Sequence, residues 1–284
     1  MKIGAHVSTA GGISNAVARG QKIGCEAIQI FGSSPQAWAF KAMPGDQIER
    51  FKQGLIDSGI GPVFLHAIYL INLGTLSKEN LQKEIDSLIN YMSLAAEIGA
   101  EGVIVHTGSH GGKGFEAVLP QVVDALKIVL DASAEGPVLA MENMPGKGQH
   151  IGVKFDELAD ILKAVDSTRL KICLDTQHAF APGYDLTDFE GIQAMLDELD
   201  LGPRYANVVA VHANDSKQVC GGVDRHDNIG DGFIGEAGFA AIMRNPVLPD
   251  VPFFLEVPGF EGKGPDLDNI NILKNIRKQT GLLG

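Results

Sequence analysis

Six side chains that could bind divalent metal ions lie at equivalent positions of the sequence. Each lies at or next to the end of a short apolar run rich in Val, Ile or Phe; they are His66, His106, Glu142, Asp175, His212 and Glu256. An imidazole or carboxylate buried alone in such a place would cost several kcal/mol in lost hydration, so these groups are usually paired or bound to metal. Six equivalent positions therefore favour a metal site over six separate structural residues.

Three further candidates could join this set. His178 follows Asp175 by three residues in LDTQHAF, which is about one helical turn. Asp224 and His226 lie in the polar, glycine-rich loop that contains VDRHDN at 223–228. A single D-x-H pair is also typical of solvated loops, so it becomes informative only if it lies close to the other candidates.

The number and types of these side chains predict which metals they would bind. A tetrahedral zinc ion takes three or four protein ligands and leaves a place for water. With one bridging carboxylate, the nine side chains would suffice for three ions. Nitrogen and oxygen ligands without sulfur suit zinc, with manganese as an alternative in part of the site, and disfavour magnesium and calcium. The cysteines Cys25, Cys173 and Cys220 form no CxxC pair and predict no disulfide framework.

Eight apolar runs must position these side chains, and each is followed by a turn and a helical pattern. We expect strands at residues 2–7, 26–31, 62–67, 102–107, 137–142, 170–175, 207–212 and 252–257. Apolar residues at spacings of three and four predict helices at 81–99 and 115–136. Ser77 before the first of these helices and Gly99 at its end are suitable start and stop signals.

Alternating strands and helices predict an α/β protein, and their number favours a single (β/α)8 TIM barrel domain over residues 1–284. A doubly wound open sheet is the main alternative, but the sequence has no G-x-G-x-x-G fingerprint and no P-loop. In a barrel the C-terminal strand ends open onto one face, where the strand-end candidates would meet.

Composition sets broad limits on function. With 45% hydrophobic and 20% charged residues, the sequence is typical of a globular protein. No apolar run is long enough to cross a membrane, and MKIGAHVSTAGG does not resemble a signal peptide, so we expect a cytoplasmic protein. The net charge of −12 would argue against a nucleic-acid partner. Bound divalent ions would change the local field where a partner binds, which makes that argument weak.

Five segments of the sequence resemble the endonuclease IV family of zinc-dependent apurinic/apyrimidinic endonucleases. They are AIYLINLG (67–74), HTGSH (106–110), DTQHAFAPGYD (175–185), HANDSK (212–217) and VDRHDNIGDGFIG (223–235). The similarity runs from KIGAHVSTAGG to FFLEVPG and includes all nine candidate ligands. It implies a xylose-isomerase-like TIM barrel and a hydrolase that cuts the phosphodiester 5′ to an abasic site. The products would be a 3′-hydroxyl and a 5′-deoxyribose phosphate, and blocked 3′ ends would also be trimmed.

The resemblance also implies how three zinc ions would be held. His66, His106 and Glu142 would bind the first ion, and Glu142 would bridge to the second. The second ion would be completed by Asp175, His212 and Glu256, and the third would be bound by His178, Asp224 and His226. Glu142 and Glu256 are the carboxylates expected to be catalytic. The expected partner is double-stranded DNA with abasic sites or blocked 3′ ends, and a monomer is expected.

Residues that would contact DNA are carried over in the same way. Tyr69 and Leu70 match the pair that the family inserts into the duplex, and insertion is cheapest where a base is already missing. Arg225 would contact a phosphate, with Lys217 as a weaker candidate. Three positions depart from the family pattern: Gln36 replaces a common minor-groove arginine, Met144 a threonine and Gln177 a cysteine.

The remaining histidines and the single tryptophan have less specific expectations. His6 ends the first strand and is equally consistent with a structural role and with support of the metal ligands. His110 and His150 lie in glycine-rich loops and are expected to be exposed to solvent. Trp38 is expected to pack in the core.

Two other functions remain open. Sugar isomerases and epimerases of the same barrel superfamily also place Glu, Asp, His and Glu at successive strand ends, like Glu142, Asp175, His212 and Glu256 here. The additional set of His66, His106, His178, Asp224 and His226 has no use in an isomerase with one ion. A non-catalytic protein that binds damaged DNA is the second alternative.

Overall fold

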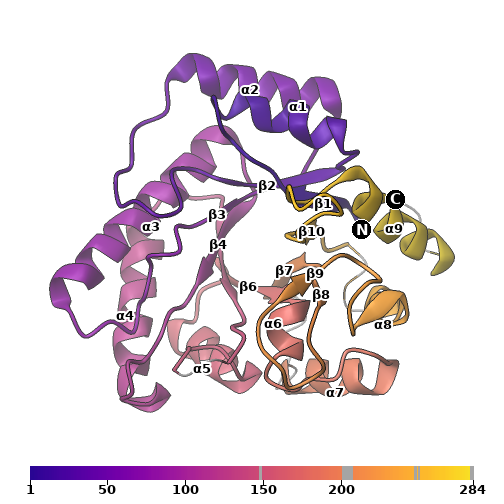
Figure 1. Ribbon diagram of the computed structural model, residues 1–284. Coiled ribbons are helices and arrows are strands. Elements are labelled where there is room, and N and C mark those ends of the chain that lie inside the picture. The colour runs from indigo at the N-terminus through magenta and orange to yellow at the C-terminus, as the bar shows by residue number, and fades with distance from the viewer. Residues whose placement is uncertain (147–148, 200–206, 246–247, 249, 282–284) are drawn as a thin grey trace.

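A closed barrel of parallel strands lies at the centre of the protein, in a computed structural model that describes residues 1–146, 149–199, 207–245, 248 and 250–281 (Figure 1). Around the barrel the strands follow the order β1-β10-β7-β6-β5-β4-β3-β2. Their bounds are β1 Ile3–His6, β2 Ala27–Phe31, β3 Val63–His66, β4 Gly102–His106, β5 Val138–Glu142, β6 Leu170–Asp175, β7 Val208–His212 and β10 Phe253–Leu255. The closed parallel barrel confirms the predicted fold class and excludes the doubly wound open sheet.

Helices surround the barrel and cover its outer surface (Figure 1). They are α1 Ser14–Lys22, α2 Gly45–Ser58, α3 Lys78–Ile98, α4 Phe115–Ala132, α5 Phe155–Val165, α7 Phe189–Leu199, α8 Gly235–Arg244 and α9 Leu267–Gln279. The short helix α6, Thr176–Phe180, is instead buried and directly follows β6. A separate two-stranded antiparallel sheet pairs β8 (Asp215–Ser216) with β9 (His226–Asp227). All eight predicted strands overlap barrel strands, with ends that differ by two residues or fewer.

The helix boundaries show which local signals operate. The hydroxyl of Ser77 accepts a hydrogen bond from the backbone N–H of Asn80 at 3.2 Å, so α3 begins at Lys78 instead of the predicted 81. Gly99 ends α3 with a left-handed φ of 73°, which costs glycine little. The second predicted helix, 115–136, ends earlier than expected because Ser133 is extended, with φ −93° and ψ 155°.

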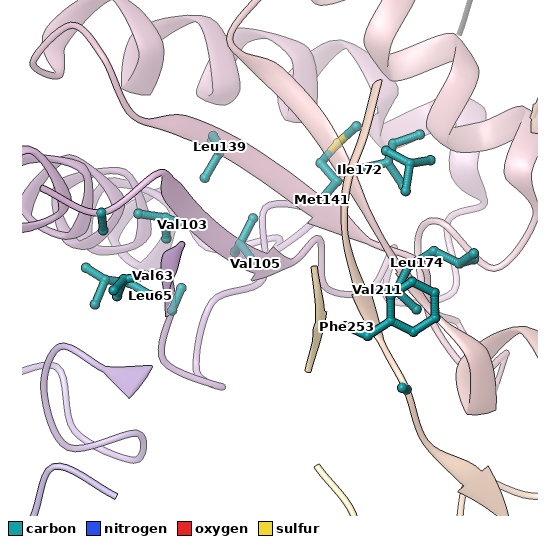
Figure 2. Close-up of a cluster of buried hydrophobic side chains, with 14 of the residues drawn as sticks. Val63, Leu65, Val103, Val105, Leu139, Met141, Ile172, Leu174, Val211 and Phe253 are labelled. Carbon is teal, nitrogen blue, oxygen red and sulfur yellow. The ribbon is translucent and has the colours of Figure 1, made fainter. Parts of the chain in front are cut away.

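Alternation along the strands divides the core into two parts. Side chains such as Val63, Leu65, Val103 and Val105 belong to the large cluster that contains residues of both strands and helices (Figure 2). A separate buried cluster consists of Ala27, Phe64, Ile104, Ala140, Cys173, Ala210 and Phe254. Full burial of one large apolar side chain stabilises the fold by roughly 1.5–3 kcal/mol.

This alternation carries the candidate ligands to one level of the barrel. Side chains two residues apart point to the same face of a strand. His66 follows Phe64, His106 follows Ile104 and Glu142 follows Ala140 by that step. The same step relates Asp175 to Cys173, His212 to Ala210 and Glu256 to Phe254. The separate buried cluster therefore forms an apolar floor beneath the polar side chains.

Among the described residues, no helix is both long enough and apolar enough to span a membrane.

Candidate metal centre

Strand register brings the predicted metal ligands together across the barrel. His106 is the register partner of Glu142 between β4 and β5, and Asp175 is the partner of His212 between β6 and β7. Glu256 comes directly after β10 (Phe253–Leu255), which pairs with β7. Because parallel strands end on the same face, ligands separated by up to 190 positions in the sequence, His66 to Glu256, meet at the C-terminal mouth.

Three overlapping groups have ligand atoms within 4.8 Å of one another. The first is His66, His106 and Glu142; the second is Glu142, Asp175, His212 and Glu256; the third is Asp175, His178 and His226. The first two contain the residues that the resemblance implies for two of the ions. The third contains Asp175 where Asp224 was expected.

Asp224 lies beside this third group. Its carboxylate oxygens are 3.8 Å from His178 Nε2 and 3.6 Å from His226 Nε2. Its side chain is 38% exposed, whereas His178 is buried. The structure therefore places the three residues expected at the third ion next to one another, with Asp175 as an additional neighbour.

Glu142 lies between the first two groups and is fully buried. Its Oε2 is 3.3 Å from His66 Nε2 and 3.1 Å from His106 Nε2. Its Oε1 is 3.1 Å from His212 Nδ1 and 3.0 Å from His178 Nδ1. One carboxylate oxygen thus faces each group, which is the arrangement that a bridging ligand requires.

Backbone carbonyls set the orientation of three of the imidazoles. Each carbonyl oxygen can only accept a hydrogen bond, so the Nδ1 atom facing it must donate, and Nε2 is left free for another partner. The pairs are His66 Nδ1 with Ala67 (2.7 Å), His178 Nδ1 with Asn143 (3.0 Å) and His226 Nδ1 with Glu256 (3.3 Å). The resulting Nε2 atoms face Glu142 or Asp224.

The buried carboxylates and imidazoles of the site shift one another's pKa values. Burial alone would raise the pKa of Glu142, but the imidazoles of His212 and His106 outweigh it and hold that pKa well below its usual range. Burial would likewise lower the pKa of His178, yet Asp175 and Glu142 raise it to about 10. These carboxylates therefore favour positive charge among them, and a divalent cation would compete with protons for the same nitrogens.

Two unpartnered atoms show that the site fits a metal ion. Glu142 Oε1 and His212 Nδ1 are buried and lie 3.1 Å apart, but among the described residues neither has a partner in hydrogen-bonding geometry. A buried polar atom without a partner is costly, and metal coordination would satisfy both. The groups contain imidazole and carboxylate ligands only. Cys173 lies in the apolar floor and outside these groups, and burial raises the pKa of its thiol to about 12. The donor set fits zinc or manganese.

Strand pairing and hydrogen bonds to Asp215 hold the segment that contains Asp224 and His226. The sequence predicted a polar, glycine-rich loop here, but His226–Asp227 form β9, and His226 pairs with Ser216 of β8. The buried carboxylate of Asp215 accepts hydrogen bonds from the backbone N–H groups of Gly230, Gly232, Ile234 and Gly235. A Cβ at Gly232 would clash with this carboxylate, which explains the glycine there.

The expected DNA contacts lie on the same face. Tyr69 is 52% exposed, and its ring centroid is 5.5 Å from that of His66 and 5.7 Å from that of His106. Leu70 is 38% exposed. Arg225 is exposed and donates to the carbonyl of Asp224 at 3.1 Å. Lys217, the weaker candidate, is 3.8 Å from Asp227.

Several minor expectations can now be compared with the structure. Trp38 is 39% exposed in the segment between β2 and α2, so the expectation that it packs in the core is wrong. His110 and His150 are half-buried instead of exposed. His110 Nδ1 accepts from the backbone N–H of Gly114 at 3.1 Å. Gln36 is exposed, and Gln177 is buried and donates to the carbonyl of Val223 at 3.3 Å.

Three buried amide side chains that contact the candidate ligands were not predicted from the sequence. Asn143 Oδ1 accepts from the backbone N–H of Asp175 at 2.7 Å, and Asn214 Nδ2 donates to Asp175 Oδ2 at 2.8 Å. Gln29 Oε1 is 2.7 Å from His212 Nε2. The sequence feature that could have identified these residues is an amide side chain inside an apolar strand, as for Gln29, or within two residues of a candidate ligand, as for Asn143 and Asn214.

Comparisons with known proteins concern the sequence and fold of nearly the whole chain. Residues 17–277 match a family model described as a xylose isomerase-like TIM barrel. The probable endonuclease 4 of Halothermothrix orenii is 38% identical over 276 residues, which are 96% of this chain and 99% of that protein. The crystal structure of endonuclease IV from Thermus thermophilus is 35% identical, with a TM-score of 0.86, and covers 98% of this chain and 100% of that one.

A solved D-tagatose 3-epimerase-like protein also matches, with 20% identity and a TM-score of 0.76 over 99% of this chain and 98% of that one. At this identity the likeness concerns the fold alone. The barrel by itself therefore does not separate a nuclease from a sugar epimerase.

Proposed function

Because this chain belongs to the endonuclease IV family, we propose that it is a DNA-repair endonuclease that acts on abasic sites in duplex DNA. It hydrolyses the phosphodiester 5′ to the abasic residue, leaves a 3′-hydroxyl and a 5′-deoxyribose phosphate, and trims blocked 3′ ends. The observation that carries this proposal is the third group of ligand atoms, formed by Asp175, His178 and His226 with Asp224 beside it. An isomerase with a single ion would not need this group.

The proposed cofactor is three zinc ions, with manganese as an alternative at part of the site. His66, His106 and Glu142 would hold one ion; Glu142, Asp175, His212 and Glu256 a second; and His178, Asp224 and His226 a third. When bound, such ions polarise a phosphodiester and make hydroxide available near neutral pH. Glu142 and Glu256, the proposed catalytic carboxylates, would hold these ions in position.

The chain's own residues would orient the phosphodiester. Burial of Glu142 and Asp175 above the apolar floor excludes water from below, so the scissile group would approach from the open mouth. Burial raises the pKa of the Tyr69 phenol to about 12, with the nearby carboxylates of Glu256 and Glu142 acting in the same direction. Its half-exposed ring and Leu70 would fill the space vacated by the extrahelical residue, and Arg225 would contact a phosphate.

The same proposal includes the organisation of the protein. The C-terminal helix α9 is hydrogen-bonded to the N-terminal part of the chain. Its Arg277 donates to the carbonyl of Met1 and to the carboxylate of Glu26. This closure supports one barrel domain over the whole chain. We further propose that the protein acts as a monomer in the cytoplasm, and that the bound ions and the basic residues at the mouth would make the local field where DNA binds less negative than the net charge of −12 suggests.

The chemical nature of the product tests this proposal. Purified protein loaded with zinc is incubated with a duplex that contains one abasic analogue, and with the same duplex without it. We expect one nick on the 5′ side, found in the abasic duplex only, with a 3′ end that a DNA polymerase extends. A blocked end, or equal cutting of both duplexes, would contradict the proposed chemistry. Conversion of ketohexoses by the same sample, without nicking, would favour the epimerase alternative.

A further inference from the structure

Gln29 is a buried polar residue in an otherwise apolar strand. β2 reads AIQIF over Ala27–Phe31, and Gln29 has no exposed surface. It follows Ala27 of the apolar floor by two residues, so its side chain faces the barrel interior at the level of the metal centre. It is not among the residues assigned to the metal ions or to DNA.

The amide of Gln29 contacts two proposed ligands of the second group. One of its atoms lies 2.7 Å from His212 Nε2, and the other lies 2.7 Å from Glu256 Oε1. A carboxylate can only accept hydrogen bonds, so the amide nitrogen must face Glu256 and donate to it. The amide oxygen then faces His212 and can only accept.

This arrangement determines which ring nitrogen of His212 is free. Because Gln29 Oε1 accepts, His212 Nε2 must carry a hydrogen and donate it. The other nitrogen, Nδ1, lies 3.1 Å from Glu142 Oε1, 3.6 Å from Asp175 Oδ2 and 3.5 Å from Glu256 Oε2. In neutral His212 the lone pair of Nδ1 therefore points into the second group.

Gln29 also restrains the carboxylate of Glu256. The amide nitrogen of Gln29 donates a hydrogen bond to Glu256 Oε1. The other carboxylate oxygen, Oε2, is therefore the one that faces His212 Nδ1. His6 Nδ1 lies 3.2 Å from the same Oε1 and 3.0 Å from the Gln29 nitrogen. Since a carboxylate oxygen can only accept, His6 with a hydrogen on Nδ1 donates to Oε1 beside Gln29. His6 and Gln29 thus hold one side of Glu256 while leaving the other side available.

We propose that Gln29 is a positioning residue of the metal centre, which holds His212 in the Nε2–H tautomer and aims Oε2 of Glu256 at the same ion. This inference rests on the proposed metal site and deepens it. Side chains that hydrogen-bond to metal ligands in this way typically contribute roughly 10–100-fold to metal affinity. The effect should be confined to the second group, since Gln29 contacts neither His66, His106 nor His178.

The first test needs no substitution. Nitrogen NMR of the zinc-loaded protein reports the tautomer of each histidine. We expect a protonated Nε2 and a zinc-bound Nδ1 for His212. A zinc-bound Nε2 on His212 would overturn the proposal even if every variant failed to fold.

The second test compares Gln29→Met, which keeps length and removes both hydrogen bonds, with Gln29→Glu, which keeps an acceptor for His212 but repels Glu256. Zinc binding is measured by chelator competition, alongside the unfolding free energy. The matched control is Gln121→Met, which removes a glutamine amide that donates to the carbonyls of Leu73 and Thr75.

We expect Gln29→Met to weaken the affinity for one zinc ion by roughly 10–100-fold and to leave the others unchanged. Gln29→Glu should retain the His212 tautomer and still lose affinity for that ion, and the Gln121→Met control should bind zinc as the unaltered chain does. Equal zinc affinity in Gln29→Met and the unaltered chain would overturn the inference. Failure of the unaltered chain to bind zinc at all would instead contradict the proposed function, so the two failures can be distinguished.

Discussion

The effect of replacing Glu84 with Gln on the free energy of unfolding should depend on pH. Glu84 lies on α3 and is 2% exposed, and among the described residues its Oε2 has no hydrogen-bond partner. Burial raises the pKa of this carboxyl to about 7, although a hydrogen bond with the backbone of Asn72 partly opposes the rise. Asn72 lies two residues after Leu70, in the segment that carries the proposed DNA contacts.

The magnitude follows from this difference in pKa. A rise from the ordinary value of 4.5 to about 7 corresponds to roughly 3 kcal/mol, at about 1.4 kcal/mol per pH unit. Between these two values the folded chain binds the proton more tightly than the unfolded chain. The free energy of unfolding therefore falls as pH rises through that window, and the full loss is present above about pH 7.

Glu84→Gln removes this loss, since an amide has no proton to release and its oxygen can still accept from Asn72. The amide nitrogen introduces a penalty that does not depend on pH. The difference in unfolding free energy between the variant and the unaltered chain should therefore grow in favour of the variant by roughly 3 kcal/mol from about pH 4 to about pH 8.

Urea unfolding of both proteins across this pH range measures the difference in their unfolding free energies. The contributions of the other titrating groups are the same in both proteins and cancel in this difference. Asp86→Asn, at an exposed carboxylate on the same helix, is the control and should change the unfolding free energy by less than about 0.5 kcal/mol. A Glu84→Gln difference that stays constant between about pH 4 and pH 8 would refute the reasoning.

Three further substitutions test the site and its frame. Tyr69→Ala should lower nicking of abasic duplex severalfold while metal content, measured by mass spectrometry, stays at the level of the unaltered chain; loss of metal would place Tyr69 in the metal site instead. Glu26→Gln should cost roughly 2–3 kcal/mol in unfolding free energy at pH 7, because Arg277 outweighs the effect of burial and lowers the pKa of Glu26 to about 2. This cost should shrink as pH falls from about 4.5 towards 2 in acid unfolding, and a cost that persists at acid pH would argue against the ion pair. Asp215→Asn should lower the affinity for one metal ion about tenfold in chelator competition, because the Asp215 carboxylate accepts hydrogen bonds from the segment that follows His226. An equal loss of affinity for all three ions would indicate general unfolding.

The barrel was predictable because its signals are local. Each strand is a short apolar run, and side chains that could bind metal recur at or next to the ends of six of these runs. The two-residue step from Phe64 to His66, or from Ala140 to Glu142, places a floor residue and a candidate ligand on one face without any knowledge of register. Helix α3 likewise follows from Ser77 and Gly99.

Details that depend on contacts between distant segments were not predictable in this way. Asp175 joins the third group because it also caps α6, where its Oδ1 accepts from the backbone N–H of His178 at 2.8 Å. β9 forms because His226 finds Ser216 as its partner, which no pattern in VDRHDN indicates. The role inferred for Gln29 needs the positions of both His212 and Glu256, contributed by strands far away in the sequence.

The central claim is that three ions, one of them held by His178, Asp224 and His226, are required to cut DNA at abasic sites. It is tested most directly by measuring metal content and nicking rate on the same samples of the unaltered chain and of the Asp224→Ala, His226→Ala double variant. We predict three ions and nicking for the unaltered chain, and two ions, an intact fold and loss of most nicking for the variant. Nicking by the variant at the unaltered rate with two ions bound would contradict the account.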